Sequence, residues 1–337
     1  PILPGRLVIM SDLLREIVAR NKAGDCVAIP SVCSSHSDVL ASSLQLTAQL
    51  GRSVVIEATS NQVNQVNQVN QFGGYTGMNA NAFVSFVNNF IETTGADPSQ
   101  VILGGDHLGP LVCKSENASA AMAKARVLVV EYIQAGIRKI HLDCSEGCAG
   151  GPAQVDDTTA AARAADLALA CQDATQNPED LTFVIGTELP PPGGVRLGED
   201  GHISATTPES ATATLKGHQD AFAQRDISDL WALVSGLVVQ PRVEFRPTEV
   251  YNLPLNWDPG LRGALGQPSR ICLEANSTDY QTPEAFSQLA NLGFAFQKVG
   301  PALTFAWQKV LYALSYILYN LLPYASGLPE VMQATMN

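Results

Sequence analysis

An Asp-His pair stands directly after an apolar run in the segment LGGDHLGP, where Asp106 and His107 are neighbours. Adjacent side chains at a strand end diverge, so the histidine can bind a divalent metal ion while the carboxylate transfers a proton. A turn in which the pair only satisfies backbone groups is the alternative. In KIHLDCSEGCAGG, His141 and Asp143 lie two residues apart and therefore face the same side of a strand. We predict an acid–base site in which Asp106 and Asp143 are catalytic carboxylates.

Other polar side chains follow other apolar runs. Glu188 precedes a rigid Pro-Gly turn in GTELPPPGG and is a candidate third metal ligand or base; an ordinary exposed carboxylate is the alternative. Lys298 and Gly300 precede a helical pattern and could hold a phosphate, whereas a lysine packed along its stem and a helix cap are the alternative. The groups at 277–279 suit a polyhydroxy ligand. The predicted substrate-binding residues are Asn61, Gln62, Gln240, Ser277, Thr278, Asp279, Lys298 and Gly300.

Eight short apolar runs must position these groups. They begin at Cys26, Ser53, Val101, Lys139, Thr182, Gly236, Ile271 and Phe294. Such runs suit strands that are buried on both faces of a parallel sheet, and helical patterns fill nearly every gap between them. The pattern predicts a (β/α)8 barrel, with a doubly wound open sheet as the alternative. In a barrel the carboxyl ends of all the strands meet at one mouth, where the polar residues would form a ring.

The chain shows no linker. We predict a single barrel domain over residues 10–325, an N-terminal extension over residues 1–9 and a C-terminal tail over residues 326–337. The segment FAWQKVLYALSYILYNLLP is strongly apolar but carries Gln308, Lys309 and Asn320, and it falls short of the roughly 20 uninterrupted apolar residues that span a membrane. We therefore predict a buried helix there and no membrane association.

Composition and missing motifs disfavour several functions. Twenty Lys and Arg against 32 Asp and Glu leave a net charge of −12, which disfavours nucleic acid as a partner. The seven cysteines form no CxxC pair, and the start lacks a signal-peptide pattern, so a cytoplasmic location is expected. No GxxxxGK[ST] loop, kinase signature or GxSxG elbow is present, which argues against a nucleotide cofactor and against serine hydrolysis.

The chain closely resembles the GatZ/KbaZ family of tagatose-1,6-bisphosphate aldolase accessory subunits, from about Met10 to about Ile317. The resemblance rests on six motifs in the same order: IEATSNQVNQVNQVNQFGGYTGM, ILGGDHLGP, KIHLDCSEGCAGGP, VIGTELPPPGG, EANSTDYQTP and KVGPALTFAWQKVLYALSYI. It implies a TIM barrel related to class II aldolases, a sugar phosphate ligand and a class II aldolase catalytic subunit as partner. Some relatives act alone as metal-dependent hexulose or hexulose-6-phosphate 4-epimerases. A homo-oligomer is a further expectation.

The resemblance also implies roles for individual residues. Asp106 would transfer protons, and His107, Glu188 and the residue at position 276 would bind Zn²⁺, Mn²⁺ or Ni²⁺. Asn276 stands where the family usually has a histidine, which should weaken metal binding, and Arg242 stands where it usually has a glycine. The resemblance implies a longer C-terminal region than the one present here.

Two functions follow from these observations. As an accessory subunit, the chain would support a class II aldolase in the catabolism of galactitol, N-acetylgalactosamine or tagatose 6-phosphate, and would need no intact site. As an enzyme, it would bind a divalent ion and interconvert tagatose and fructose forms of a ketohexose or its 6-phosphate at C4. Asn276 and Arg242 favour the first function.

The stretch TSNQVNQVNQVNQF carries two more copies of Asn-Gln-Val than the family it resembles. A period of three matches neither a helix nor a strand, so the extra copies form no amphipathic element. Either Asn61 and Gln62 or Asn70 and Gln71 could hold the amide position at the barrel mouth. We favour Asn61 and Gln62 because they directly follow the predicted strand.

Overall fold

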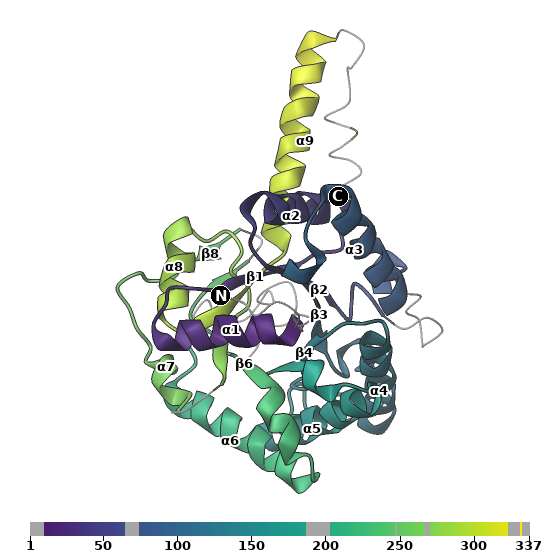
Figure 1. The fold of residues 1–337 in the computed structure, drawn as a ribbon, viewed down its shortest axis with the longest axis vertical. Coiled ribbons are helices and arrows are strands. Elements are labelled where there is room, and N and C mark those ends of the chain that lie inside the picture. Colours follow the sequence, from purple (N-terminus) through teal and green to yellow (C-terminus); the bar gives the residue numbers. More distant parts are fainter. Residues whose placement is uncertain are drawn as a thin grey trace, which may run out of the picture.

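The protein folds into a closed barrel of eight parallel strands, in the order β1-β10-β9-β6-β5-β4-β3-β2 (Figure 1). The computed structural model describes residues 10–64, 74–186, 203–246, 248–266, 270–322 and 331. The barrel strands are β1 (Ile29–Cys33), β2 (Val54–Thr59), β3 (Val101–Leu108), β4 (Lys139–Leu142), β5 (Thr182–Ile185), β6 (Val234–Val238), β9 (Cys272–Ala275) and β10 (Phe294–Val299). Each overlaps one of the eight apolar runs, so the predicted barrel is confirmed over the open sheet.

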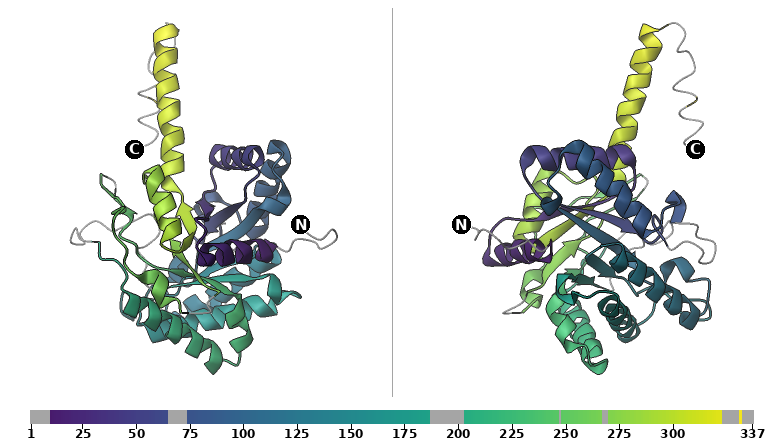
Figure 2. Two further views of the ribbon diagram at one scale, coloured as in Figure 1. Left: turned by 60° about the vertical axis from the view of Figure 1, so that its left-hand side comes forward. Right: turned by 45° about the vertical axis from the view of Figure 1, so that its right-hand side comes forward.

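Helices surround this barrel on its outside (Figure 2). They are α1 (Met10–Ala23), α2 (Ser37–Leu50), α3 (Ala80–Thr94), α4 (Ala118–Gln134), α5 (Asp157–Asp173), α6 (Pro208–Gln224), α7 (Leu261–Ala264), α8 (Pro283–Asn291) and α9 (Pro301–Leu321). A small antiparallel hairpin of β7 (Glu244–Phe245) and β8 (Val250–Tyr251) follows β6 and was not predicted. No helix among the described residues is both long enough and apolar enough to cross a membrane.

Local sequence explains where several helices begin and end. Asn79, Asn117 and Asp156 each accept a hydrogen bond from a backbone N–H three residues further on, at the starts of α3, α4 and α5. Gly51 and Gly95 end α2 and α3 in the left-handed conformation that glycine adopts without strain. These signals set where the helices between the strands begin and end.

The lower part of the barrel interior is apolar. Leu14 and Val18 of α1 pack in one cluster with residues near the amino ends of the strands, including Ile29, Val55 and Ile102. All five side chains are at most 2% exposed. Helix α1 therefore closes the end of the barrel that lies opposite the strand carboxyl ends.

The next layer of the interior is charged. Lys139 Nζ lies 2.5 Å from Glu57 Oε1 and 2.8 Å from Glu274 Oε2, and all three residues are fully buried. Burial alone would lower the pKa of Lys139, but the two carboxylates raise it to about 12. Gly104 makes room for this layer, because a Cβ at that position would lie 2.7 Å from Glu57 Cγ. The layer was not predicted, since Lys139 opens an apolar run.

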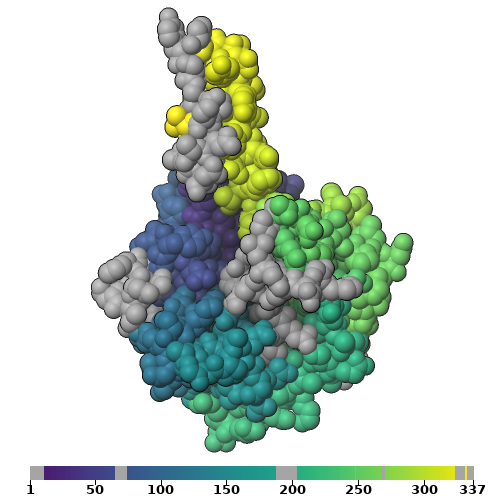
Figure 3. Space-filling model, turned by 180° about the vertical axis from the view of Figure 1, so that it is seen from behind, coloured from purple at the N-terminus to yellow at the C-terminus, as the bar shows by residue number. Residues whose placement is uncertain are grey.

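Helix α9 begins against the barrel and then projects away from it. Near its start, the Trp307 ring packs 4.4 Å from the ring of His36. Farther along, the helix stands out from the rounded body of the molecule (Figure 3), and Val310, Leu314, Ile317 and Leu321 are 49–70% exposed. The prediction that this segment is buried is wrong, because its outer half is covered by no other element of the described chain.

The predicted outer segments lie largely outside the described residues. This is true of residues 1–9 and, apart from Val331, of residues 326–337. Their assignment as an extension and a tail stays a prediction.

Candidate active site

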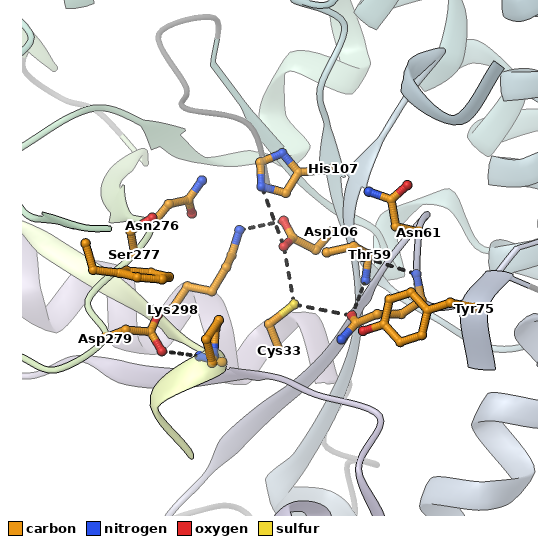
Figure 4. A pocket seen from close by; sticks show the side chains of 14 residues that line it. Cys33, Thr59, Asn61, Tyr75, Asp106, His107, Asn276, Ser277, Asp279 and Lys298 are labelled. Carbon is orange, nitrogen blue, oxygen red and sulfur yellow. Dashed lines mark hydrogen bonds and ion pairs between the residues drawn. The ribbon is translucent and has the colours of Figure 1, made fainter. Parts of the chain in front are cut away.

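A pocket of about 250 Å³ opens at the carboxyl ends of the barrel strands (Figure 4). Position rather than size marks it as the candidate site, because chemistry in such barrels is carried out at this end. Asp143, Gln240 and Thr278 are described residues that do not line it, and Glu188 lies outside the described residues. The predicted residues that line it are Asn61, Gln62, Asp106, His107, Asn276, Ser277, Asp279, Lys298 and Gly300.

Asp106 is the most connected group in the pocket. Its Oδ1 atom lies 2.8 Å from His141 Nδ1 and 2.5 Å from Lys298 Nζ, and its side chain is 1% exposed. Burial by itself would raise the pKa of Asp106, but the neighbouring His107, Lys298 and His141 hold it well below the usual value. Asp106 is therefore an anion at neutral pH.

His107 is held by a second carboxylate. Its Nδ1 atom lies 2.7 Å from Asp143 Oδ2, while Asp143 Oδ1 accepts hydrogen bonds from the Ser145 backbone N–H and hydroxyl. Because the carboxylate can only accept, His107 Nδ1 carries a hydrogen. Burial alone would lower the pKa of His107, but Asp106 and Asp143 raise it above its usual value, so a metal ion at Nε2 would replace a proton there. His107 also has a φ of 47°, a strained conformation of the kind that gathers at functional sites. Asp143 thus orients His107 from behind the pocket wall.

His141 repeats this arrangement with Asp106 as its carboxylate. Its Nδ1 atom faces Asp106, and its Nε2 atom is buried without a hydrogen-bond partner among the described residues. Burial lowers the pKa of His141, which favours the neutral imidazole that metal ions require. The sequence placed His141 and Asp143 on one face of a strand, but it did not identify His141 as a ligand.

The donor atoms of Asp106, His107 and His141 fit a divalent metal ion. One ligand atom from each lies within 4.8 Å of the others, and His107 Nε2 is 3.8 Å from Asp106 Oδ2. Two ligands bound about 2.1 Å from one ion lie at such a separation. Imidazole nitrogens backed by carboxylates, with a carboxylate oxygen, suit zinc or a similar transition metal. The predicted set of His107, Glu188 and Asn276 shares only His107 with this cluster.

The buried charges around the cluster are also favourable for a cation. The buried ion pairs around the cluster and in the layer beneath it join four carboxylates to two ammonium groups and two imidazoles. The carboxylates are Glu57, Asp106, Asp143 and Glu274, the ammonium groups are Lys139 and Lys298, and the imidazoles are His107 and His141. A buried excess of negative charge is unfavourable unless it is compensated, and a divalent ion would compensate it.

Asn276 presents an amide without a partner to the pocket. It is 8% exposed, and neither its oxygen nor its nitrogen has a hydrogen-bond partner among the described residues. Figure 4 shows it across from His107. Since buried polar groups are normally satisfied, this amide is suited to meet a bound ligand. The neighbouring Ser277 has a φ of 58°, so the backbone is strained here as well.

The predicted phosphate site at Lys298 and Gly300 has a different arrangement. Lys298 Nζ pairs with Asp106, and the backbone N–H groups of Gly300 and Ala302 both donate to Asp279 Oδ1, at 3.0 and 2.7 Å. The start of α9 is thus already capped by a carboxylate. Thr278 is fully buried and donates its hydroxyl hydrogen to the Lys298 carbonyl, so it fixes the strand end rather than facing a ligand.

The Asn-Gln pair after β2 lies at the mouth, as favoured. Gln62 Oε1 accepts from the Thr59 backbone N–H at 2.9 Å, and the Asn61 carbonyl accepts from the Tyr75 backbone N–H at 3.0 Å. The bond between Asn61 and Tyr75 joins the two ends of the stretched loop. Asn70 and Gln71 lie among residues 65–73, outside the described part of the chain.

The loop after β6 contributes a carboxylate that the sequence analysis missed. Gln240 Nε2 lies 3.5 Å from Glu244 Oε2, and burial raises the pKa of Glu244 to about 7. Gln240 itself bonds through its backbone N–H to the Thr206 hydroxyl, which ties this loop down. Arg242 has a φ of 67° and lies 5.7 Å from the Trp257 ring. A lone Glu in a loop gives no sequence signal for such a shift.

The strands and helices define the closed (β/α)8 barrel, a fold in which sites lie at the carboxyl ends of the strands. The fold is similar to that of a fructose-bisphosphate aldolase from Campylobacter jejuni, with a TM-score of 0.57 over 92% of this chain and 82% of that one, at 16% identity. A family model described as D-tagatose-1,6-bisphosphate aldolase subunit GatZ/KbaZ-like matches residues 14–337. The chain belongs to this family.

Two other proteins are much more similar to this chain in sequence than the fructose-bisphosphate aldolase is. A D-tagatose 6-phosphate 4-epimerase from Agrobacterium fabrum is 42% identical over 311 residues, which cover 91% of this chain and 71% of that protein. The structure of a probable tagatose 6 phosphate kinase from Sinorhizobium meliloti is similar to this one, with a TM-score of 0.81 at 40% identity, over 92% of this chain and 74% of that one. The predicted family is therefore confirmed.

Proposed function

We propose that the protein is a metal-dependent 4-epimerase of a ketohexose 6-phosphate that interconverts tagatose and fructose forms. The observation that carries this proposal is the pair of carboxylate-backed imidazoles, His107 with Asp143 and His141 with Asp106, at the mouth of the barrel. A protein that only supported another subunit would need no such site. The 42% identity to a D-tagatose 6-phosphate 4-epimerase supports the same reaction.

The geometry suits chemistry at C4 of the sugar. In a retro-aldol step, Asp106 accepts the proton of the C4 hydroxyl, the C3–C4 bond breaks, and its electron pair passes to the C2 carbonyl. Rotation of the aldehyde and re-addition to its other face, with return of the proton, give the C4 epimer. Lys298, whose Nζ atom borders the same pocket, can stabilise charge that develops on the sugar oxygens.

A divalent ion held by His107 and His141 would supply Lewis acidity at the sugar oxygens, which leaves the Oδ2 atom of the neighbouring Asp106 to accept the proton. Asn276 is suited to bind a hydroxyl or carbonyl of the sugar with its unpartnered amide. We place the further predicted contacts at Asn61, Gln62 and Ser277, and the role of Glu188 as a ligand or base stays part of the proposal. Cytoplasmic location is proposed with the metabolic role.

The test uses the purified chain alone, after removal of metal and after addition of Zn²⁺, Mn²⁺ or Ni²⁺, with tagatose 6-phosphate. We expect fructose 6-phosphate to form with at least one of the ions, and its formation to be lost in Asp106→Asn. A wild-type chain that is folded, binds the metal and still forms no fructose 6-phosphate would exclude the epimerase function.

The family description supports a second candidate, an aldolase subunit. In that function the chain would bind a class II aldolase catalytic subunit and raise its activity on tagatose 1,6-bisphosphate. The exposed apolar residues on the outer half of α9 provide surface for such a partner. Mixing the two purified chains tests it: activation that survives in Asp106→Asn would show a role that is independent of the site.

A further inference from the structure

Glu274 lies between two lysines inside the barrel. Its Oε2 atom is 2.8 Å from Lys139 Nζ and its Oε1 atom is 3.3 Å from Lys298 Nζ, so it forms an ion pair with each lysine. Glu274 is fully buried and comes from β9, whereas the lysines come from β4 and β10. One carboxylate thus spans the interior and connects the charged layer to the pocket.

The first of these lysines is firmly held. Lys139 Nζ also pairs with Glu57 Oε1 at 2.5 Å and lies 5.3 Å from the centroid of the Phe296 ring. A cation bound on three sides in a closed interior has little freedom to move. Lys139 therefore fixes the place of the Glu274 carboxylate that it contacts.

The second lysine acts in the pocket. Lys298 Nζ lies 2.5 Å from Asp106 Oδ1, and Lys298 lines the cavity at 6% exposure. A lysine side chain has four flexible carbon–carbon torsions, so its position depends on the charges around its tip. Among the described residues, Glu274 and Asp106 are the carboxylates that pair with it.

We infer that Glu274 is a positioning residue for the site. Lys139 fixes the Glu274 carboxylate, and that carboxylate holds the Lys298 ammonium group against Asp106. Only the catalytic consequence of this inference rests on the proposed epimerase function. The path runs through five groups of alternating charge: Glu57, Lys139, Glu274, Lys298 and Asp106. Of these five residues, Lys298 and Asp106 line the pocket and would contact the sugar, whereas Glu57, Lys139 and Glu274 do not line it.

Glu57 is a matched control for Glu274. Both are fully buried glutamates on barrel strands, and both pair with Lys139. Of the two, Glu274 forms the ion pair with Lys298, whereas Glu57 acts on Lys298 through charge at longer range. Neutralising either one leaves a buried lysine with one carboxylate less, so both Glu57→Gln and Glu274→Gln should lower the melting temperature. A difference at the site between the two variants then reports positioning rather than loss of stability.

The experiment compares crystal structures and kinetics of the two variants. We expect Lys298 Nζ to leave Asp106 in Glu274→Gln and to stay there in Glu57→Gln. We expect kcat to fall about 10- to 100-fold in Glu274→Gln, with KM nearly unchanged, because small misplacements of a catalytic group have effects of that size. Glu274→Asp, which restores the charge, should recover part of kcat.

Two results would overturn the inference: an unchanged Lys298–Asp106 contact in Glu274→Gln, or an equal loss of kcat in both variants. If the wild-type chain shows no epimerase activity, the proposed function fails. The crystal structures still test whether Glu274 positions Lys298, so the two failures can be distinguished. If Glu274→Gln does not fold, the pair Glu274→Asp and Glu57→Asp replaces it, with the same contact measured and the same two overturning results.

Discussion

The Oδ2 atom of Asp143 lies 2.7 Å from the Nδ1 atom of His107 and holds the imidazole in place. Asp143 itself lies behind the pocket and does not line it. The side-chain hydrogen bond and charge of His107 lower the pKa of Asp143 against the effect of its burial, so this carboxylate stays an anion. The pair is the clearest link in the molecule between a supporting residue and a candidate ligand.

Removing this support should weaken metal binding. In Asp143→Asn the acceptor charge behind His107 is lost, and changes to such supporting carboxylates typically reduce metal affinity about 10- to 100-fold. Titration calorimetry with Zn²⁺ or Mn²⁺ measures the effect. Asp156→Asn is the control, because Asp156 caps α5 at the surface and should leave metal affinity unchanged. Equal affinities of wild type and Asp143→Asn would remove His107 from the ligand set.

Asn276→His should strengthen metal binding, because it adds an imidazole to a pocket that His107 and Asp106 already line. The same calorimetry compares this variant with Asn276→Ala, which removes the amide and adds no ligand. We expect a gain for the histidine only. If neither variant changes the affinity, position 276 faces the sugar rather than the ion.

Glu244 should make stability depend on pH near neutrality. Its folded-state pKa of about 7 is raised above the usual value, so the folded protein binds more protons than the unfolded chain between these two values, and stability falls as pH rises through that window. Glu244→Gln removes the titration. The variant should gain in melting temperature relative to wild type at about pH 8, and much less at about pH 3, where the carboxyl is protonated in both states. A difference that does not change with pH would contradict the raised pKa.

Gly104→Ala should destabilise the barrel by about 1–3 kcal/mol, since the added Cβ would crowd the Glu57 side chain inside a charged layer that cannot expand. Gly217→Ala is the control. Gly217 lies within α6, and an added Cβ would meet no atom within 4 Å beyond its chain neighbours and its own helix backbone, so this change should stabilise the protein by about 0.4–1 kcal/mol. Urea unfolding of both variants measures the two signs. Equal effects would show that Gly104 is not constrained by packing.

Ile317→Lys should leave thermal stability almost unchanged, because Ile317 is 52% exposed on the projecting half of α9. Ile140→Lys, at a fully buried position of β4, should prevent folding. Circular dichroism during heating compares the two. A large loss in Ile317→Lys would mean that α9 packs against another surface in solution.

Local patterns in the sequence predicted the barrel and the main pair of the site. Strands buried on both faces produce continuous apolar runs, and parallel strands bring their polar carboxyl ends together. The sequence therefore predicts that Asp106, His107, Asn276 and Lys298 lie at one mouth, and all four line the pocket there. Asn61 and Gln62 were placed there by the same rule, in spite of the repeat that follows them.

The remaining features depend on partners far apart in the chain. Lys139 pairs with Glu57 across 82 positions, and nothing local to either residue signals that pairing. The burial of α9 was predicted wrongly because an apolar segment does not reveal whether another element covers it. His141 was missed as a ligand because its role depends on Asp106 from a different strand.

The packing of α1 over the amino ends of the strands has a consequence for the proposed reaction. The barrel is closed at its amino end, because Leu14 and Val18 fill that end. If the sugar splits between C3 and C4, neither fragment can leave through the amino end of the barrel. Both must leave through the mouth by which the sugar entered. An epimerase must rejoin its fragments before they escape, whereas an aldolase must release them. Access through the mouth would therefore decide whether the fragments are rejoined or released.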